Sequence, residues 1–357
     1  MLEKQAFSPE TWKELILNYP KKKNKMESKK LLFLQKSKKT KKEDKKSLAN
    51  SFFFPLLSLW IILVLLFLGS KIIKAEPEIV GKKEALGFRQ LLPSPMPYPV
   101  NRKVSVTPEV SAKSIYIIDS GSMRVLYEKN PEERLFPAST TKIMTALVAL
   151  EHYRTDQILK AGNTEVEGNV IELEPEEQMS VENLLYGLLV GSGNDAAFAL
   201  SENYPGKTPG FVEAMNRKAQ EINLKNTRFT NPVGFDEPGH FSTAKDLALL
   251  TAEAVKNPVF SRIVATSGLT LTDVSGTKTH YLKNTNELIG QVEGVVGVKT
   301  GWTENAGECL VSLAERKDAR VISVVLGSTG RFEESKSLID WTFQNFDWVS
   351  ILPASYH

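Results

Sequence analysis

A serine and a lysine lie three positions apart in Ser139-Thr140-Thr141-Lys142, where a loop containing Pro137 runs into an apolar segment that favours a helix. Positions i and i+3 of a helix share one face, so the Lys142 amine can reach the Ser139 hydroxyl. The helix start also points free N–H groups and its positive end at Ser139. A serine alcohol becomes a good nucleophile when a nearby base takes its proton, and a neutral lysine is such a base. Because Ser-x-x-Lys is common by chance, the pair needs support from the rest of the chain.

Two further motifs supply that support. Ser192-Gly193-Asn194 follows a leucine-rich stretch in a loop rich in glycine, and Lys299-Thr300-Gly301 ends a strand-like run. Each motif means little alone. The ordered set of three, at a helix start, a loop and a strand edge, predicts that the motifs form one site around the Ser139 hydroxyl.

An antiparallel sheet and a helical region must position these motifs. Alternating and continuous apolar runs predict strands at 114–119, 124–127, 295–299, 309–314 and 321–326. A mainly helical stretch runs from 139 to about 259, with its clearest helices at 181–190, 211–222 and 243–255, and a last helix covers 333–346. A hairpin, then helices, then three strands and a helix predicts an α+β fold whose strands pair over long sequence separations.

Residues from about 112 to 346 resemble the serine D-alanyl-D-alanine carboxypeptidases, which are the low-molecular-mass penicillin-binding proteins of the peptidase S11-like family. The resemblance rests on the three motifs and on four further runs, at 211–219, 227–234, 242–246 and 306–311. It implies a β-lactamase/penicillin-binding transpeptidase-like fold, with an antiparallel sheet flanked by helices, in a catalytic domain at 111–350.

The resemblance implies a catalytic role for three residues. Ser139 would attack the carbonyl of the penultimate D-Ala and form an acyl-enzyme, and Lys142 would take the serine's proton. Ser192 would relay a proton to the leaving D-Ala amine. Burial and a second cation, for which Lys299 is the candidate, would keep Lys142 neutral.

The same resemblance implies a set of substrate-binding residues. Asn194 would hold the substrate amide, and the backbone N–H groups of Ser139 and Trp302 would form the oxyanion hole. The terminal carboxylate would lie against Lys299, Thr300 and Arg331. The substrate-binding residues are thus Asn194, Lys299, Thr300, Gly301, Trp302 and Arg331. The expected ligands are peptidoglycan stem peptides, with β-lactam antibiotics as inhibitors.

The chain before this domain predicts a membrane-anchored protein. Residues 1–46 are lysine-rich and poor in apolar residues, which favours disorder. Residues 47–70 carry no charge and are long enough to span a bilayer as a helix. Residues 71–110 form a proline-rich linker. The lysine excess before the anchor places the N-terminus in the bacterial cytoplasm and the catalytic domain outside.

The length of the anchor and the charge of the tail before it bear on cleavage and on binding partners. Its apolar region exceeds that of a cleavable signal, although cleavage after Ala75 stays open as a minority alternative. Residues 1–50 hold 15 lysines and six acids, so the excess of positive charge lies in this tail and the rest of the chain is acidic. Binding of a nucleic acid would therefore rest on the tail alone. The adjacent anchor explains that tail more simply, and we expect no nucleic-acid partner.

Composition argues against a metal or cofactor. The single cysteine, Cys309, excludes an internal disulfide and a cysteine-built metal site, and the four histidines lie far apart. We expect His240 and His280 to be structural or surface residues, and Asp195 to fix its loop. No metal site and no organic cofactor are predicted.

Three alternative functions remain to be weighed. A D,D-endopeptidase of peptidoglycan cross-links shares every motif and stays open. A class A β-lactamase would need a Glu-x-x-Leu-Asn run after Ser192, and none occurs before Lys299. A tethered wall-binding protein without activity would not need an intact nucleophile and base.

The chain departs from the family in two ways. The run 172–177 lacks a glycine that the family pattern leads us to expect before the acid, which puts the local loop shape in question. Many members continue into an all-β domain and a C-terminal membrane helix, whereas here we expect the anchor at the N-terminus.

Overall fold

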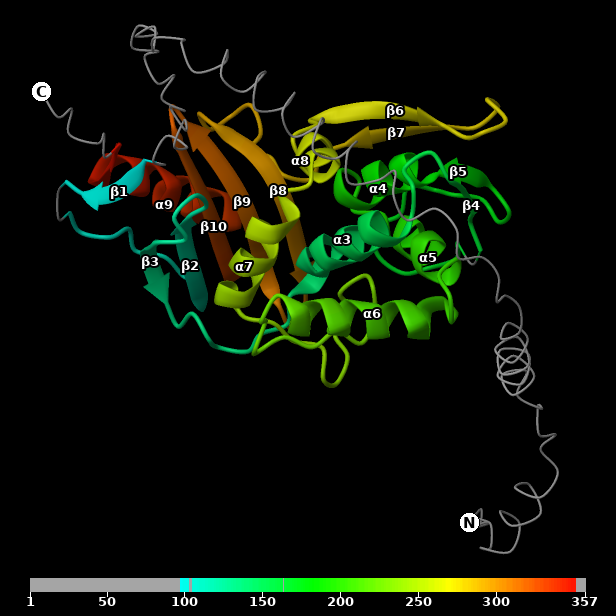
Figure 1. Ribbon diagram of the computed structural model, residues 1–357, viewed down its shortest axis with the longest axis horizontal. Coiled ribbons are helices and arrows are strands. Elements are labelled where there is room, and N and C mark those ends of the chain that lie inside the picture. Colours follow the sequence, from blue (N-terminus) through cyan, green and yellow to red (C-terminus); the bar gives the residue numbers. More distant parts are fainter. Residues whose placement is uncertain (1–96, 103–104, 163, 351–357) are drawn as a thin grey trace, which may run out of the picture. The chain divides into compact units, whose positions relative to one another are not determined.

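The computed structural model describes residues 97–102, 105–162 and 164–350 (Figure 1). The predicted tail at 1–46, the anchor at 47–70 and most of the linker at 71–110 lie outside these residues. Within the described part of the chain, no helix combines the length and the apolar character needed to cross a membrane.

A five-stranded antiparallel sheet forms the centre of the fold, in the order β3-β2-β10-β9-β8. Its strands are β2 (Ser114–Asp119), β3 (Val125–Lys129), β8 (Val295–Thr303), β9 (Gly307–Arg316) and β10 (Ala319–Ser328). Because β2 pairs with β10, segments about 200 residues apart lie side by side. This confirms the predicted α+β fold with strands paired over long separations.

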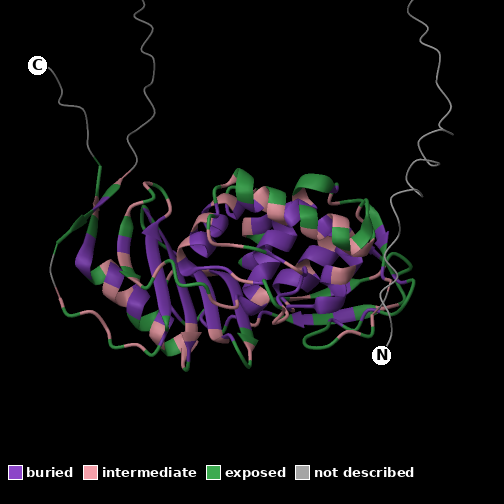
Figure 2. Cartoon of the chain, turned by 90° about the horizontal axis from the view of Figure 1, so that it is seen from below, coloured by how far each residue is buried: buried purple, intermediate pink, exposed green. Residues whose placement is uncertain are grey.

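Alternate side chains of the sheet pack on its two faces. Ile115 and Ile117 of β2 share a core with Leu338 of α9 (Arg331–Asn345), whereas Tyr116 and Ile118 join the larger core of the helical region. Successive residues of a strand point to opposite faces, so a strand buried on both sides is apolar throughout. Figure 2 shows buried residues running through the sheet and the neighbouring helices.

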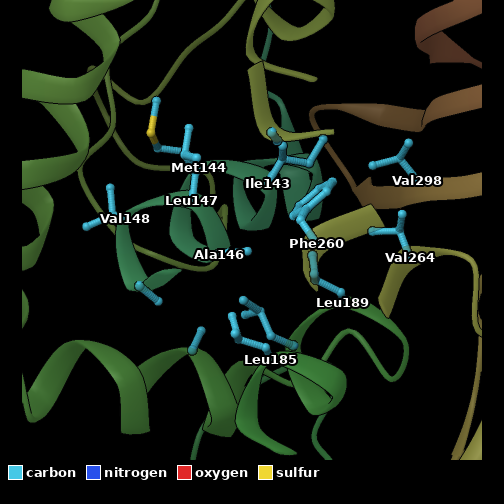
Figure 3. Packing of buried hydrophobic residues seen from close by; sticks show 14 of the residues in the cluster. Ile143, Met144, Ala146, Leu147, Val148, Leu185, Leu189, Phe260, Val264 and Val298 are labelled. Carbon is cyan, nitrogen blue, oxygen red and sulfur yellow. The ribbon is translucent and has the colours of Figure 1, made fainter. Parts of the chain in front are cut away.

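The helical region surrounds α3 (Lys142–His152), which is buried along most of its length. Figure 3 shows Ile143 of this helix beside Phe260, and Ala146 on the side of Leu185 and Leu189. A helix that is apolar on all sides is stable only inside a protein. Its neighbours are η1 (Ala138–Thr141), α4 (Val181–Leu189), α5 (Asn194–Glu202), α6 (Lys207–Glu221) and α7 (Ala244–Ala254), while α8 (Pro258–Val264) contacts α4 and β8.

Three two-stranded sheets complete the described elements: β1 (Tyr98–Asn101) with β11 (Phe346–Val349), β4 (Ile158–Lys160) with β5 (Gln178–Ser180), and β6 (Gly268–Thr272) with β7 (Thr279–Lys283). β1 falls within the predicted linker. Pro99 is accommodated there because a two-stranded sheet has only edge strands, which tolerate a missing N–H donor.

The predicted elements agree with the structure except at several ends. β8 continues four residues past Lys299, and α6 begins four residues before Phe211. Asn194, which the sequence placed in a loop, is the first residue of α5. The short segments α8, β4, β5, β6 and β7 were not predicted, because their periodic patterns are too short.

The missing glycine of the 172–177 run has a backbone consequence that a substitution can test. Glu176 has φ of 65°, a left-handed conformation that costs a residue with a Cβ about 1 kcal/mol. Glu176→Gly is therefore expected to raise the free energy of unfolding by about 1 kcal/mol in urea denaturation. The ion pair of Glu176 with Lys160 is exposed and contributes little. Glu174→Gly, at a residue without positive φ, should not stabilise; equal gains at both positions would contradict this account.

Candidate active site

Ser139 lies in the 3-10 turn η1, one turn before α3, rather than in the α-helix itself. Ala138, which precedes it, has φ of 47°, a strained conformation of the kind that often occurs at functional sites. Lys142 opens α3, and its Nζ lies 2.8 Å from Ser139 Oγ. The i to i+3 spacing therefore does bring the two side chains together.

The buried Lys142 amine has two further neighbours. It donates to Asn194 Oδ1 at 2.6 Å and to the Val233 carbonyl at 3.3 Å. Both of these oxygens can only accept, so a neutral amine donates its two hydrogens to them. Its lone pair is then left to accept a hydrogen bond from the Ser139 hydroxyl. The arrangement is that of a base poised to take the serine's proton.

Burial lowers the pKa of Lys142 well below its usual range, the positive charge of Lys299 lowers it further, and Asp195 opposes the change. Lys299 is itself buried, and its Nζ donates to the Thr300 carbonyl at 3.1 Å. Burial and then Arg331 lower the pKa of Lys299 to about 7. The positive charge of Lys299 thus helps burial to keep the Lys142 amine neutral beside Ser139.

The Ser192 loop joins α4 to α5. Ser192 is buried with φ of 60°, and Asn194 donates through Nδ2 to the Glu167 carbonyl at 2.5 Å. The Asp195 carboxylate accepts from the backbone N–H groups of Ile171 and Leu173, each at 3.0 Å. Asp195 therefore holds the neighbouring 167–173 segment against the loop that carries Ser192 and Asn194.

His280 supports the same segment from β7. Its Nδ1 lies 2.7 Å from the Ile171 carbonyl, and its Nε2 lies 2.6 Å from Oε1 of the buried Glu177. Both ring nitrogens are therefore held in place, one by a backbone carbonyl and one by a buried carboxyl group. His280 is thus a buried structural residue rather than part of the cleft.

The edge strand β8 passes close to Ser139. A Cβ at Gly301 would lie 3.0 Å from the Ser139 nitrogen and 3.1 Å from the Pro137 oxygen, so a side chain there would crowd the serine turn. Trp302 follows with 64% of its surface exposed. Arg331 donates from Nη1 to the Gly301 carbonyl at 3.0 Å, and its buried Nε has no hydrogen-bond partner in the described structure.

These residues meet at a cleft of about 630 Å³. The predicted residues that line it are Ser139, Ser192, Asn194, Thr300, Gly301, Trp302 and Arg331, while Lys142 and Lys299 are buried. The other lining residues include Glu167, Asn169, Phe235, Thr285, Glu287 and Glu304, which sequence reasoning missed. A separate cavity of about 550 Å³ beside Lys160 contains none of the predicted residues.

Thr285 shows why such residues escape the sequence. Its hydroxyl lies 2.6 Å from the Thr300 hydroxyl, although nothing in its local sequence marks it. The contact depends on how the segment after β7 folds back toward β8. Only the assembled sheet reveals it.

An α+β fold in which Ser-x-x-Lys, Ser-x-Asn and Lys-Thr-Gly converge on one cleft defines the class of β-lactamases and penicillin-binding proteins. Within that class, residues 101–330 match the Peptidase S11 family of D-alanyl-D-alanine carboxypeptidases, and the chain belongs to this family.

Curated relatives and solved structures agree with this placement. The chain is 38% identical over 246 residues to D-alanyl-D-alanine carboxypeptidase DacF of Bacillus subtilis, covering 66% of this chain and 63% of DacF. It is 36% identical over 260 residues to DacC of Escherichia coli, covering 68% and 64%. The match therefore spans less than two thirds of the length of these relatives.

The fold is also similar to that of a solved structure, along the whole length of the solved chain. The crystal structure of the Streptomyces K15 DD-transpeptidase is similar with a TM-score of 0.64 at 32% identity, covering 67% of this chain and 100% of that one.

Proposed function

We propose that this protein is a serine-type D-alanyl-D-alanine carboxypeptidase, which removes the terminal D-Ala from peptidoglycan stem pentapeptides and is acylated by β-lactams. The observation that carries the proposal is the buried Lys142 amine 2.8 Å from Ser139 Oγ, at the cleft where the other two motifs meet. Family membership and the names of the relatives support the same substrate class.

Acylation follows from this geometry. As Ser139 Oγ attacks the carbonyl carbon of the penultimate D-Ala, its proton passes to the Lys142 lone pair. The developing oxyanion would be stabilised by the backbone N–H groups of Ser139 and Trp302, which belong to segments in close contact. Lys142 then holds a proton that must reach the leaving amine.

Ser192 would carry that proton onward. It lines the cleft two residues before Asn194, whose Oδ1 accepts a hydrogen bond from Lys142. When the amine leaves as D-Ala, the acyl group remains on Ser139, and water releases it with Lys142 again acting as base. Asn194 also lines the cleft, where it would hold the substrate amide.

The substrate carboxylate would lie between Thr300 and Arg331. The Arg331 guanidinium and the Thr300 hydroxyl line the cleft, and the buried Lys299 amine lies beside Thr300, so that one anion could be bound by these groups together. Because the terminal D-Ala carries this carboxylate, its recognition would select free peptide ends.

Arg331→Gln tests the carboxylate assignment. A hydrogen bond to a charged group contributes about 1.5–3 kcal/mol, so kcat/KM for a free-acid substrate is expected to fall about 10- to 100-fold. A substrate with an amidated C-terminus should lose much less. Arg320→Gln, at an exposed residue of β10, serves as the control. Equal losses on both substrates would remove Arg331 from this role.

The function itself is tested with the full-length chain in detergent, a fluorescent penicillin and diacetyl-Lys-D-Ala-D-Ala. A covalent adduct together with released D-Ala is expected. An adduct with cleavage only of cross-linked peptides would favour the endopeptidase, and transfer only to an added amine would indicate a transpeptidase. Rapid penicillin turnover without peptide cleavage would indicate a β-lactamase, and no reaction at all would leave a wall-binding protein.

We infer in addition that the protein is a single-pass protein of the bacterial cell membrane, with its catalytic domain outside. The uncharged stretch at 47–70 and the lysines that precede it support this topology. Full-length protein should stay in membranes washed at alkaline pH, and protease added to spheroplasts should digest the catalytic domain. Release by the wash, or protection from protease, would contradict the inference.

A further inference from the structure

The buried side chain of His240 joins the 230–242 segment to the Ser-x-x-Lys turn. Its Nδ1 accepts a hydrogen bond from the Thr230 backbone N–H at 3.1 Å, so that nitrogen carries no hydrogen. The ring hydrogen is therefore on Nε2, which donates to Thr141 Oγ1 at 2.9 Å. Thr141 lies between Ser139 and Lys142 in the sequence, so a neutral imidazole links this segment to the nucleophile and base.

The segment held by His240 covers Lys142. Asn231 Oδ1 accepts from the backbone N–H groups of Val233, Gly234 and Phe235 at 3.2, 2.7 and 3.0 Å, which folds residues 231–235 into a tight turn. The Val233 carbonyl of this turn accepts from Lys142 Nζ at 3.3 Å.

The turn also packs against the residue before the nucleophile. Gly234 has φ of 96°, and a Cβ there would lie 1.9 Å from the Ala138 oxygen. Val233, Gly234 and Phe235 form part of the cleft lining. The turn thus separates the lysine amine from solvent on that side.

We propose that His240 is a positioning residue, which holds the 231–235 turn over Lys142 and so keeps the amine buried and able to act as a base. This inference rests on the proposed function, in which Lys142 deprotonates Ser139. His240 acts only through Thr141 and the turn, since it does not line the cleft.

The charges around the two groups agree with this role. His240 faces Asp236 and Glu237 of its own segment, but burial outweighs them and lowers the pKa of the ring to about 4, so it stays neutral at neutral pH. The charges that act on Lys142 are Lys299 on β8 and Asp195 on α5. The 231–235 turn therefore affects the pKa of Lys142 through burial rather than charge.

His240→Leu is the direct test, with acylation of the full-length chain by a fluorescent penicillin measured from pH 5 to 10. Loss of the ring's hydrogen bonds to Thr141 and Thr230 should admit water to Lys142 and raise its pKa, since desolvation of the amine holds that pKa down. The acid limb of the profile should move up by about one pH unit, so acylation on that limb falls about tenfold, while rates above the limb stay near those of the wild type.

Two further variants make the test specific. His240→Gln keeps an acceptor and an N–H donor and is expected to restore most of the wild-type profile. Thr141→Val removes the hydroxyl at the other end of the bond and should reproduce the shift, with no additional shift in the His240→Leu/Thr141→Val double variant. Thr141→Val also carries the test if His240→Leu does not fold.

Val325→Ala is the control for stability, because Val325 belongs to the core on the α9 face of the sheet. It should lower the melting temperature and leave the acid limb in place. If the pH profile of His240→Leu is unchanged, or if its acylation rate falls by the same factor at every pH, His240 is a structural residue and the proposal is wrong. Failure of the wild-type chain to react with penicillin would instead overturn the proposed function.

Discussion

Ser139→Ala is expected to abolish covalent labelling by penicillin and to reduce D-Ala release to background, a loss on the order of 10⁶ in kcat. The reason is that Ser139 Oγ is the hydroxyl within hydrogen-bonding distance of the Lys142 amine, 2.8 Å away, and is therefore the one that this base can activate. Labelling on denaturing gels and the intact mass of the protein after reaction measure the outcome.

The fold should survive this change. Ser139 is only partly buried, and the removed atom leaves Lys142 with its contacts to Asn194 and Val233. Melting curves should therefore be close to those of the wild type. Ser275→Ala, in the exposed β6–β7 connection, should label normally. A penicillin adduct of unchanged stoichiometry in Ser139→Ala would show that another residue is the nucleophile.

The elements around Ser139 could be predicted because their signals are local. The i to i+3 spacing places Lys142 beside Ser139, and the continuous apolar run at 114–119 marks a strand buried on both faces. Asn194 was placed in a loop because Gly191 and Gly193 precede it, whereas the structure starts α5 there. Gly193 precedes that helix start, and glycine is acceptable at an N-cap position.

The walls of the cleft could not be predicted, because they depend on contacts between distant segments. Thr285 reaches Thr300, Glu167 reaches Asn194, and Val233 reaches Lys142 only when the helices and the sheet have packed together. The hydrogen bond between His240 and Thr141 joins residues 99 positions apart, and no periodic pattern in the sequence predicts it. Such contacts follow from tertiary packing, which overrides local preference.

Lys142→Met is expected to slow acylation by about 10³-fold at neutral pH, which is within the usual range for loss of a general base. Methionine has similar length and fits the buried site, but it cannot take a proton. In the wild type, the lowered pKa of Lys142 leaves the amine neutral above that pKa, so activity is present there and is lost as the pH falls through it. The acid limb due to Lys142 should therefore disappear in Lys142→Met.

Lys142→Arg separates the role of a base from that of a positive charge. Arginine keeps the charge and stays protonated in proteins, so it should acylate as slowly as the methionine variant if Lys142 works as a base. Stopped-flow acylation by penicillin across pH 5–10 measures both variants, and their melting temperatures show whether the fold is retained. Recovery of the rate in Lys142→Arg would assign Lys142 an electrostatic role. Near-wild-type rates in Lys142→Met would mean that a different group deprotonates Ser139, and the nearby buried amine of Lys299 would then be the first to test.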